Sequence, residues 1–248
     1  YKKYILECLR DNWISTGGKY INKFEAKISK YLKIKYVSSV INGTSALDIA
    51  LKVLGVSKDH EILVPTLTFI APINAVIYNN ASPIFFDCDE FCNIDSKNVI
   101  DFILNKTKFN GKNCINKKTK KIIKAIIIVH VFGNAANMTQ LLKLCKKNKI
   151  KVIEDASESF GSRYSNGINK GKFTGTIGDI GCFSFNGNKI ITAGSGGAIV
   201  SNNKKLIDKS KYLINQAKDN NFANAGTSFT LKLSIFKTDF ETLFFFID

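Results

Sequence analysis

The stretch KAIIIVHVFGNAANMTQLLKLCKKNKIKVIED, residues 124–155, places two short apolar runs on either side of an amphipathic segment. The apolar runs are rich in Ile and Val and have the length of buried strands, whereas MTQLLKLCKKN repeats its apolar residues with a helical period. A strand, a crossover helix and a second strand form a βαβ unit, in which the two strands run parallel. This stretch therefore predicts an α/β fold.

The same alternation continues on both sides of this stretch. Three further strand-like runs are each followed by a helical pattern, the pairs being 36–41 with 45–56, 61–65 with 69–80, and 83–87 with 96–104. The repetition predicts a mostly parallel sheet covered by helices on both faces. Because such sheets bind ligands at the carboxyl ends of their strands, the polar residues that follow these runs are the candidates for a site.

Composition narrows the class of protein. The 248 residues are 45% hydrophobic and 23% charged, which is typical of a globular domain. No apolar run is long enough to span a bilayer, and the first residues lack the apolar core of a signal peptide, so we expect a cytoplasmic protein without a membrane partner. Six cysteines without a CxxC pair and only two histidines predict reduced thiols and no metal site.

The formal net charge of +16 would suit a nucleic-acid or anionic-membrane binder. However, only Arg10 and Arg163 are arginines, and the lysines are spread along the whole chain. The most lysine-rich run, NKTKFNGKNCINKKTKKIIK at 105–124, has one aromatic residue and no nucleic-acid-binding motif. We interpret this run as a solvated insertion and expect no nucleic-acid partner.

The motif NGTSA, residues 42–46, lies where a predicted strand ends and a helix begins. Backbone N–H groups at a helix N-terminus, with the hydroxyls of Thr44 and Ser45 beside them, form a site for a phosphate dianion. Ser and Thr also cap many helices that bind nothing. The motif alone therefore leaves both interpretations open.

A second motif, IEDASESFGS at 153–162, places Asp155 at the end of a predicted strand. A carboxylate there can hold a protonated heterocyclic nitrogen, and Glu158, three residues on, can reach the same ligand. A helix-capping Asp followed by a solvated Glu is the alternative.

The third motif is CFSFNGNKIITAGSGGAIV, residues 182–200, where Lys189 lies in a polar loop between two strand-like runs. A partly buried amine tends to lose its proton and becomes a nucleophile toward carbonyls, although most lysines are solvated. Ser184 precedes it, and the glycines after it allow close backbone approach. A phosphate site, a carboxylate for a ring nitrogen and a reactive amine are together the requirements of pyridoxal phosphate (PLP) binding.

Five segments, in order and spacing, resemble the DegT/DnrJ/StrS family of PLP-dependent nucleotide-sugar aminotransferases: NGTSALDIAL, VPTLTFIAPINAV, VHVFGNAANM, VIEDASESFGS and SFNGNKIITAGSGGAI. The resemblance implies the large domain of the aspartate aminotransferase-like PLP-dependent transferases, known as fold type I. It also implies a homodimer that moves an amino group from glutamate to a nucleotide-linked keto-sugar.

The resemblance assigns roles to single residues. Lys189 would form the internal aldimine with PLP and act as general base and acid, and Asp155 would hold the proton on the pyridine nitrogen. Glu158 would lie near the ring hydroxyl and Phe69 would stack on the ring. The phosphate ligands would be Thr44, Ser45 and Ser184. Ser195 stands where the family usually has Glu or Gly.

Within the family, the motifs SFNGNKxIT and EDASESFGS most resemble those of the branch that aminates C4 of UDP-4-keto-6-deoxy-N-acetylhexosamines. That branch serves surface polysaccharides or glycans, on the route to bacillosamine or legionaminic acid. The GDP-perosamine type is the alternative within the family. The family's dehydratases carry histidine in place of the lysine, so Lys189 argues against them. A truncated, non-catalytic protein that binds PLP or a nucleotide is the alternative from another class.

After residue 218 the resemblance ends, without the GYNYR-like motif and the small C-terminal domain of the family. We therefore expect a PLP-binding large domain with an N-terminal helical segment at 1–218, and a divergent tail without an assigned fold at 219–248. Because a partner's GYNYR-like segment would supply an asparagine to the phosphate, we expect negligible turnover from the chain as written.

Overall fold

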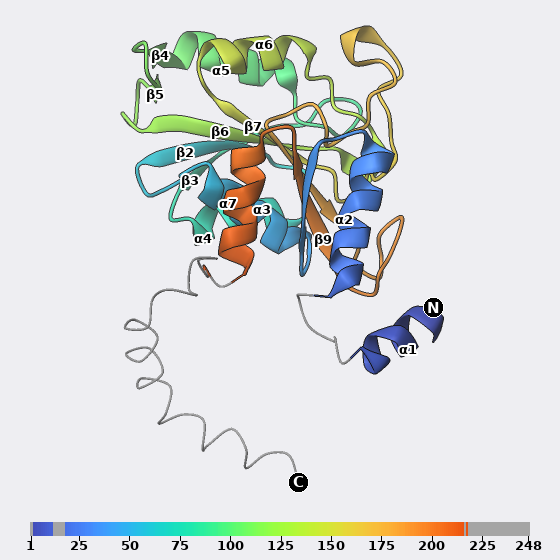
Figure 1. Cartoon of the computed structure of the whole chain (residues 1–248). Helices are drawn as coiled ribbons and strands as arrows, with labels where there is room; N and C mark the ends of the chain where they lie inside the picture. The colour runs from blue at the N-terminus through green and yellow to red at the C-terminus, as the bar shows by residue number, and fades with distance from the viewer. Residues whose placement is uncertain (1, 12–17, 216, 218–248) are drawn as a thin grey trace, which may run out of the picture. The chain divides into compact units, whose positions relative to one another are not determined.

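The computed structural model describes residues 2–11, 18–215 and 217 (Figure 1). The chain divides into two compact units, Tyr1–Lys211 and Tyr212–Asp248. Only residues 212–215 and 217 of the second unit are described. The tail expected at 219–248 lies outside the described residues, and the domain division at 218 stays a prediction.

The first unit is built on one sheet, whose main path has seven strands. In spatial order these are β1 (Tyr36–Val40), β9 (Gly197–Ser201), β8 (Ile180–Ser184), β7 (Lys151–Asp155), β6 (Ile122–Val129), β2 (His60–Pro65) and β3 (Ser82–Phe86). The four pairings from β8 to β3 are parallel, and β9 runs antiparallel to both β1 and β8. The prediction of a mostly parallel sheet is therefore confirmed, and Lys189 lies in the connection between the two strands β8 and β9.

Helices cover both faces of this sheet, as predicted (Figure 1). One face carries α5 (Ser96–Lys106) and α6 (Thr139–Lys147), and the other carries α3 (Gly43–Val53), α4 (Ile70–Tyr78) and α7 (Lys204–Ile214). The remaining helices are α1 (Lys2–Arg10), α2 (Lys19–Leu32) and the 3-10 turns η1 (Val131–Gly133) and η2 (Gly167–Asn169). The side chain of Asn42 accepts a hydrogen bond from Ser45 N–H and so caps α3.

The apolar runs of the sequence are the strands that are buried on both faces. Ile126 and Ile128 of β6 pack in one core cluster with Val99 of α5 and Leu141 of α6. A second cluster joins α2 to β1, β8 and β9. A strand covered on both faces needs apolar side chains at successive positions, which explains the unbroken run AIIIV.

The lysine-rich run at 105–124 departs from its interpretation as a solvated insertion. It contains the short strands β4 (Thr107–Phe109) and β5 (Cys114–Asn116), which form an antiparallel pair, and β5 also pairs with the start of β6. Cys114 and Asn116 are buried, and Asn116 Nδ2 donates to the carboxylate of buried Glu61 at 2.8 Å. The interpretation is wrong for this hairpin because alternate residues of β5 face inward while the lysines around them stay in solvent.

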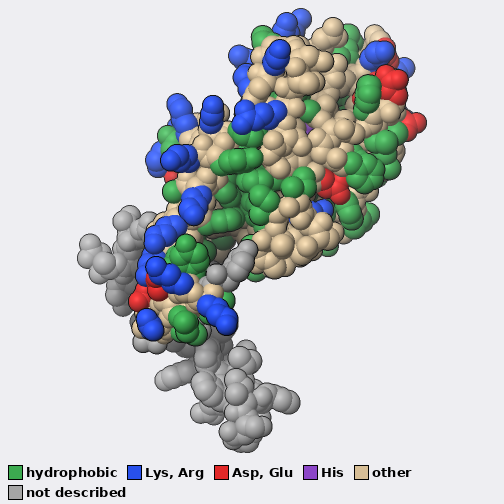
Figure 2. Space-filling view, turned by 90° about the vertical axis from the view of Figure 1, so that its right-hand side faces the viewer, with side chains coloured by type: hydrophobic (Ala, Val, Ile, Leu, Met, Phe, Trp, Pro, Cys, Tyr) green, Lys and Arg blue, Asp and Glu red, His purple; other side chains and the backbone are tan. Residues whose placement is uncertain are grey.

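The surface carries the excess of positive charge. Figure 2 shows Lys and Arg side chains mainly along the left-hand and upper edges of the face in view, with hydrophobic side chains over its middle. All six cysteines lie in the described part of the chain, and none is paired there. Within the described ranges, no helix has the length and apolar character needed to cross a bilayer.

Candidate active site

The carboxyl ends of the central strands open onto a cavity of about 330 Å³. Six of the seven residues predicted to form a site line it: Thr44, Phe69, Asp155, Glu158, Ser184 and Lys189. The seventh, Ser45, is described but is not among the lining residues, and its backbone N–H is already bonded to the cap residue Asn42. The structure thus gathers three distant motifs at one place and leaves Ser45 outside it.

Lys189 reaches the cavity from the loop between β8 and β9. Its Nζ lies 4.5 Å from the centroid of the Phe69 ring and 3.7 Å from Glu158 Oε1. The Lys189 side chain is 13% exposed, so the amine is largely withdrawn from solvent. The amine is therefore flanked by an aromatic ring and a carboxylate.

The loop that carries Lys189 is held by hydrogen bonds at its base and at its far side. Phe185 N–H donates to Gly196 O at 2.8 Å, where Gly196 has a φ of 132° that a side chain would not tolerate. Ser195 Oγ donates to Ile41 O at 2.8 Å and ties the loop to the end of β1. Ser195, whose role the sequence left open, therefore fixes this loop.

The first turn of α3 forms a narrow cradle. A Cβ placed on Gly43 would lie 2.8 Å from Ser184 Cβ and 3.0 Å from Ser157 Oγ, so only glycine fits. Hydroxyls of Ser157, Ser184 and Thr44 line the cavity around this helix N-terminus. N–H groups, a helix dipole and hydroxyls are the donor set that suits a phosphate dianion.

Asp155 ends β7 with its carboxylate buried in the cavity. Its Oδ1 accepts a hydrogen bond from Ser157 N–H at 3.0 Å. Burial raises the pKa of this carboxyl group above its usual range, although hydrogen bonds from Ser157 and the charge of Lys189 oppose the shift. A bound cationic N–H group would offset the cost of this buried charge.

Glu158 and Glu154 are the other two carboxylates of this segment. Glu158 Oε2 accepts a hydrogen bond from Phe132 N–H at 3.0 Å, while Oε1 faces Lys189. Glu154 lies on the opposite face of β7 and is fully buried, with His130 Nε2 at 2.9 Å from its Oε2.

Sequence reasoning missed several residues that line the cavity. Ser157 follows Asp155 by two positions, and its place after a strand end was a usable signal. Thr68 precedes Phe69 in TLTF, and its buried Oγ1 has no hydrogen-bond partner among the described residues. An unpartnered hydroxyl in a cavity indicates a ligand that completes its bonding.

These residues fit PLP. The cavity offers an amine for a carbonyl, a buried carboxylate for a ring nitrogen, an aromatic face for the ring and a cradle for the phosphate. Thr68 adds a hydroxyl that needs a partner. The match extends to each polar part of the cofactor.

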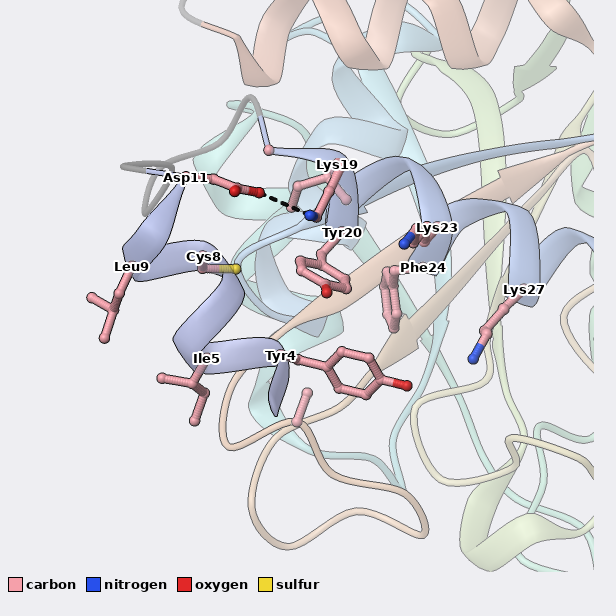
Figure 3. A pocket seen from close by; sticks show the side chains of 13 residues that line it. Tyr4, Ile5, Cys8, Leu9, Asp11, Lys19, Tyr20, Lys23, Phe24 and Lys27 are labelled. Carbon is pink, nitrogen blue, oxygen red and sulfur yellow. Dashed lines mark hydrogen bonds and ion pairs between the residues drawn. The ribbon is translucent and has the colours of Figure 1, made fainter. Parts of the chain in front are cut away.

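A larger hollow of about 910 Å³ lies between α1, α2 and Ala193 (Figure 3). Ala193 belongs to the lysine loop, the connection between β8 and β9 that carries Lys189. Tyr20 and Phe24 of α2 line it, together with the Lys19–Asp11 ion pair at 2.8 Å and the side chains of Lys23 and Lys27. This lining offers apolar and aromatic surface rather than the set of groups that PLP needs. We therefore place the chemistry in the smaller cavity around Lys189.

The fold and the Lys189 cavity together define the large domain of a PLP-dependent transferase of fold type I, as expected. The model of the DegT/DnrJ/EryC1/StrS aminotransferase family matches residues 1–237. The chain belongs to this family, whose aminotransferases depend on PLP.

Several proteins similar to this chain are named for reactions of nucleotide-linked sugars. A GDP-perosamine synthase of Escherichia coli O157:H7 is 44% identical over 208 residues, which cover 84% of this chain and 52% of that protein. A UDP-4-amino-4,6-dideoxy-N-acetyl-beta-L-altrosamine transaminase of Campylobacter jejuni is 36% identical over 209 residues, covering 84% and 50%. The crystal structure of an aminotransferase from Psychrobacter cryohalolentis matches with a TM-score of 0.76 at 28% identity, covering 91% and 53%. The chain spans about half the length of the curated relatives it matches.

Proposed function

We propose that this chain forms the PLP-binding part of an enzyme that transfers an amino group to a nucleotide-linked keto-sugar. The observation that carries the proposal is the position of Lys189 Nζ, between the Phe69 ring and the Glu158 carboxylate, in the same cavity as Asp155. Family membership supports the same reaction.

Each lining residue has a task in this proposal. PLP, when bound, supplies an electron sink for the carbon that gains or loses the amine. Lys189 Nζ would hold the cofactor carbonyl and serve as the base and acid for the proton, and Asp155 would keep the proton on the ring nitrogen. Phe69 covers one face of the ring, and Ser184, Thr44 and the N–H groups of the α3 terminus bind the phosphate.

The substrate is a 4-keto-6-deoxy sugar linked to a nucleoside diphosphate. The sequence motifs favour a UDP-linked N-acetylhexosamine as substrate, whereas the 44% identity to a GDP-perosamine synthase favours the GDP-linked alternative. We propose the GDP sugar first, and keep the UDP sugar as the second candidate because of the Campylobacter jejuni relative at 36% identity. Glutamate as donor and a homodimer as the active form complete the proposal.

The test is an amine-transfer assay with the protein at its full natural length. Glutamate is supplied with a GDP- or a UDP-linked 4-keto-6-deoxy sugar, and the aminated product is measured by mass spectrometry. We expect turnover with the GDP sugar and a loss of at least about 100-fold in Lys189→Ala. The matched control is Lys204→Ala, which removes an exposed lysine paired only with Asp208. Equal turnover in Lys189→Ala, or none with either sugar, would refute the proposal.

A further inference from the structure

The turn that follows β6 is strained. Phe132, inside η1, has a φ of 51°, and Gly133 has a φ of 87°. A bulky side chain at positive φ is an outlier that the surrounding structure has to stabilise. The Phe132 ring is 77% exposed, so its own packing does not hold the turn. The buried side chain of Val131 and hydrogen bonds from the backbone of the turn hold it instead.

Two side chains accept hydrogen bonds from the backbone of this turn, and a third, that of His130 just before it, accepts one from Ala136 just after it. Asn93 Oδ1 accepts from Val131 N–H at 3.2 Å, and His130 Nδ1 accepts from Ala136 N–H at 3.1 Å. The other side chain that accepts from the turn itself is that of Glu158, which takes the N–H of Phe132. Asn93 and His130 are buried and thus have fixed positions, whereas Glu158 lies in the cavity.

His130 is itself fixed by Glu154. Because Nδ1 accepts a hydrogen bond from Ala136 N–H, the ring proton lies on Nε2, which donates to Glu154 Oε2 at 2.9 Å. The Glu154 carboxylate also accepts the N–H groups of Gly175, Ile177 and Gly178, at 2.9, 2.6 and 2.6 Å. The imidazole therefore cannot rotate without breaking these hydrogen bonds.

The consequence reaches the cavity through Glu158. Its Oε2 is bound by Phe132 N–H, which leaves Oε1 to face Lys189 Nζ at 3.7 Å. A shift of the turn would carry Phe132 N–H away and free the carboxylate to rotate. The orientation of the charge beside Lys189 thus depends on the turn.

We propose that Asn93 and His130 are positioning residues for Glu158: they hold the strained turn whose Phe132 N–H orients the Glu158 carboxylate toward Lys189. The inference rests on the proposed function in so far as Lys189 is the residue that binds PLP. Neither Asn93 nor His130 lines the cavity among the described residues, so both act through the turn.

The first test follows the visible absorbance of the PLP-bound protein as a function of pH. The yellow form carries a proton on the nitrogen that links Lys189 to the cofactor, so its midpoint reports the charge placed beside that nitrogen. Glu158→Gln removes this negative charge and should lower the midpoint by about one pH unit. Asn93→Ala should move it by about 0.3 pH unit or more, which is a twofold change in the proton equilibrium.

A double variant separates positioning from general damage. In the Glu158→Gln background, Asn93→Ala should have no further effect on the midpoint, because the charge that it positions is gone. The matched control is Asn116→Ala, another buried asparagine with a side-chain hydrogen bond, which lies near the opposite end of β6. It should leave the midpoint unchanged. An equal Asn93→Ala shift in both backgrounds, or no shift in either, would overturn the proposal.

A second test needs no cofactor and uses Asn93→Ala and Glu158→Ala. Hydrogen exchange of the Phe132 amide should be slow in the unaltered protein and at least about tenfold faster in both Glu158→Ala and Asn93→Ala. Unchanged exchange in either variant would overturn the inference. Failure of the unaltered protein to bind PLP, with the exchange result as expected, would instead count against the proposed function alone.

Discussion

Glu154 and Asp155 are neighbours on β7, both buried, and yet they have opposite environments. Side chains alternate along a strand, so Glu154 points to one face of the sheet and Asp155 to the other. Glu154 accepts four N–H groups, from His130, Gly175, Ile177 and Gly178. Asp155 accepts one side-chain-to-backbone bond, from Ser157 N–H, and otherwise faces the cavity.

The two carboxyl groups respond to burial in different ways. Burial alone would raise the pKa of Glu154, but its bonds to His130 and to the N–H groups of the 175–178 segment outweigh it and lower the pKa. At Asp155 burial prevails and the pKa is raised. Glu154 is thus a buried charge with a full set of hydrogen-bond donors, whereas Asp155 is a buried carboxyl group with one donor and a face open to the cavity.

The largest effect is expected from Glu154→Ala. The change leaves four N–H donors without an acceptor, two of them buried and two partly buried, so the free energy of unfolding should fall by about 3–5 kcal/mol. Urea unfolding followed by circular dichroism measures it. The matched control, Glu61→Ala, removes a buried carboxylate with one side-chain donor, Asn116, and should cost less. A loss below about 1 kcal/mol in Glu154→Ala would show that the buried network contributes little.

Gly43→Ala tests whether the first turn of α3 forms the phosphate cradle of the cavity. The new Cβ would press on Ser184 and Ser157, so we expect a loss of about 1–3 kcal/mol in stability and weaker PLP binding. Thermal unfolding and a PLP titration measure the two effects. The control is Gly187→Ala in the lysine loop, where a Cβ would meet no atom within 4 Å. Equal PLP affinity in Gly43→Ala would contradict the assignment of the cradle.

Asp155→Asn should raise the free energy of unfolding of the cofactor-free protein, whereas Glu154→Ala should lower it. Because the pKa of Asp155 is raised on folding, the folded cofactor-free protein binds more protons than the unfolded chain between the ordinary Asp pKa and the raised value. Stability is therefore lost as pH rises through this window. Removing the charge should stabilise the cofactor-free protein by about 1 kcal/mol at pH 7 and weaken PLP binding.

The measurement for this variant is unfolding at several pH values with and without PLP. The stabilising effect of Asp155→Asn should disappear at a pH below both pKa values, where the carboxyl group is protonated in both states. Destabilisation of the cofactor-free protein at pH 7 would contradict the contrast between the two faces.

The smallest effect is expected from Ser45→Ala. The Ser45 side chain is not among the residues that line the cavity, and its backbone N–H, which the change keeps, serves the cap. PLP affinity should change by less than about twofold. Asn42→Ala is the comparison, since removal of the cap acceptor should cost about 1 kcal/mol of stability. A large loss of PLP affinity in Ser45→Ala would return this residue to the phosphate site.

Much of this arrangement could be predicted from the sequence because the α/β pattern brings strand ends together. Thr44, Asp155, Ser184 and Lys189 each follow or end an apolar run, and parallel strands place such ends on one edge of a sheet. The role of Ser45 was not predictable in the same way, because whether a hydroxyl of a helix's first turn faces a ligand depends on the rotation of that turn.

Other features of the structure could not be predicted, because they depend on contacts between residues that are far apart in the sequence. Glu154 stands next to Asp155 in a single motif, and its partner His130 is 24 residues away, on the neighbouring strand's end. The buried residues of β5 were obscured by the lysines around them. The strained backbone at Phe132 follows from hydrogen bonds to Asn93 and Glu158, which are far from it in sequence.

Borohydride reduction followed by peptide mapping tests most directly whether the cavity holds PLP through Lys189. The chain has 36 Lys and Arg residues, of which two are arginines, so 34 lysines compete for the aldehyde. With PLP titrated from below stoichiometry, we expect one label per chain, on Lys189, before any other lysine reacts. Lys189→Ala should lose this first label, and Asp155→Asn should require more PLP to acquire it. First labelling of another lysine, or even labelling of many surface lysines with Lys189 no faster than the rest, would contradict the account.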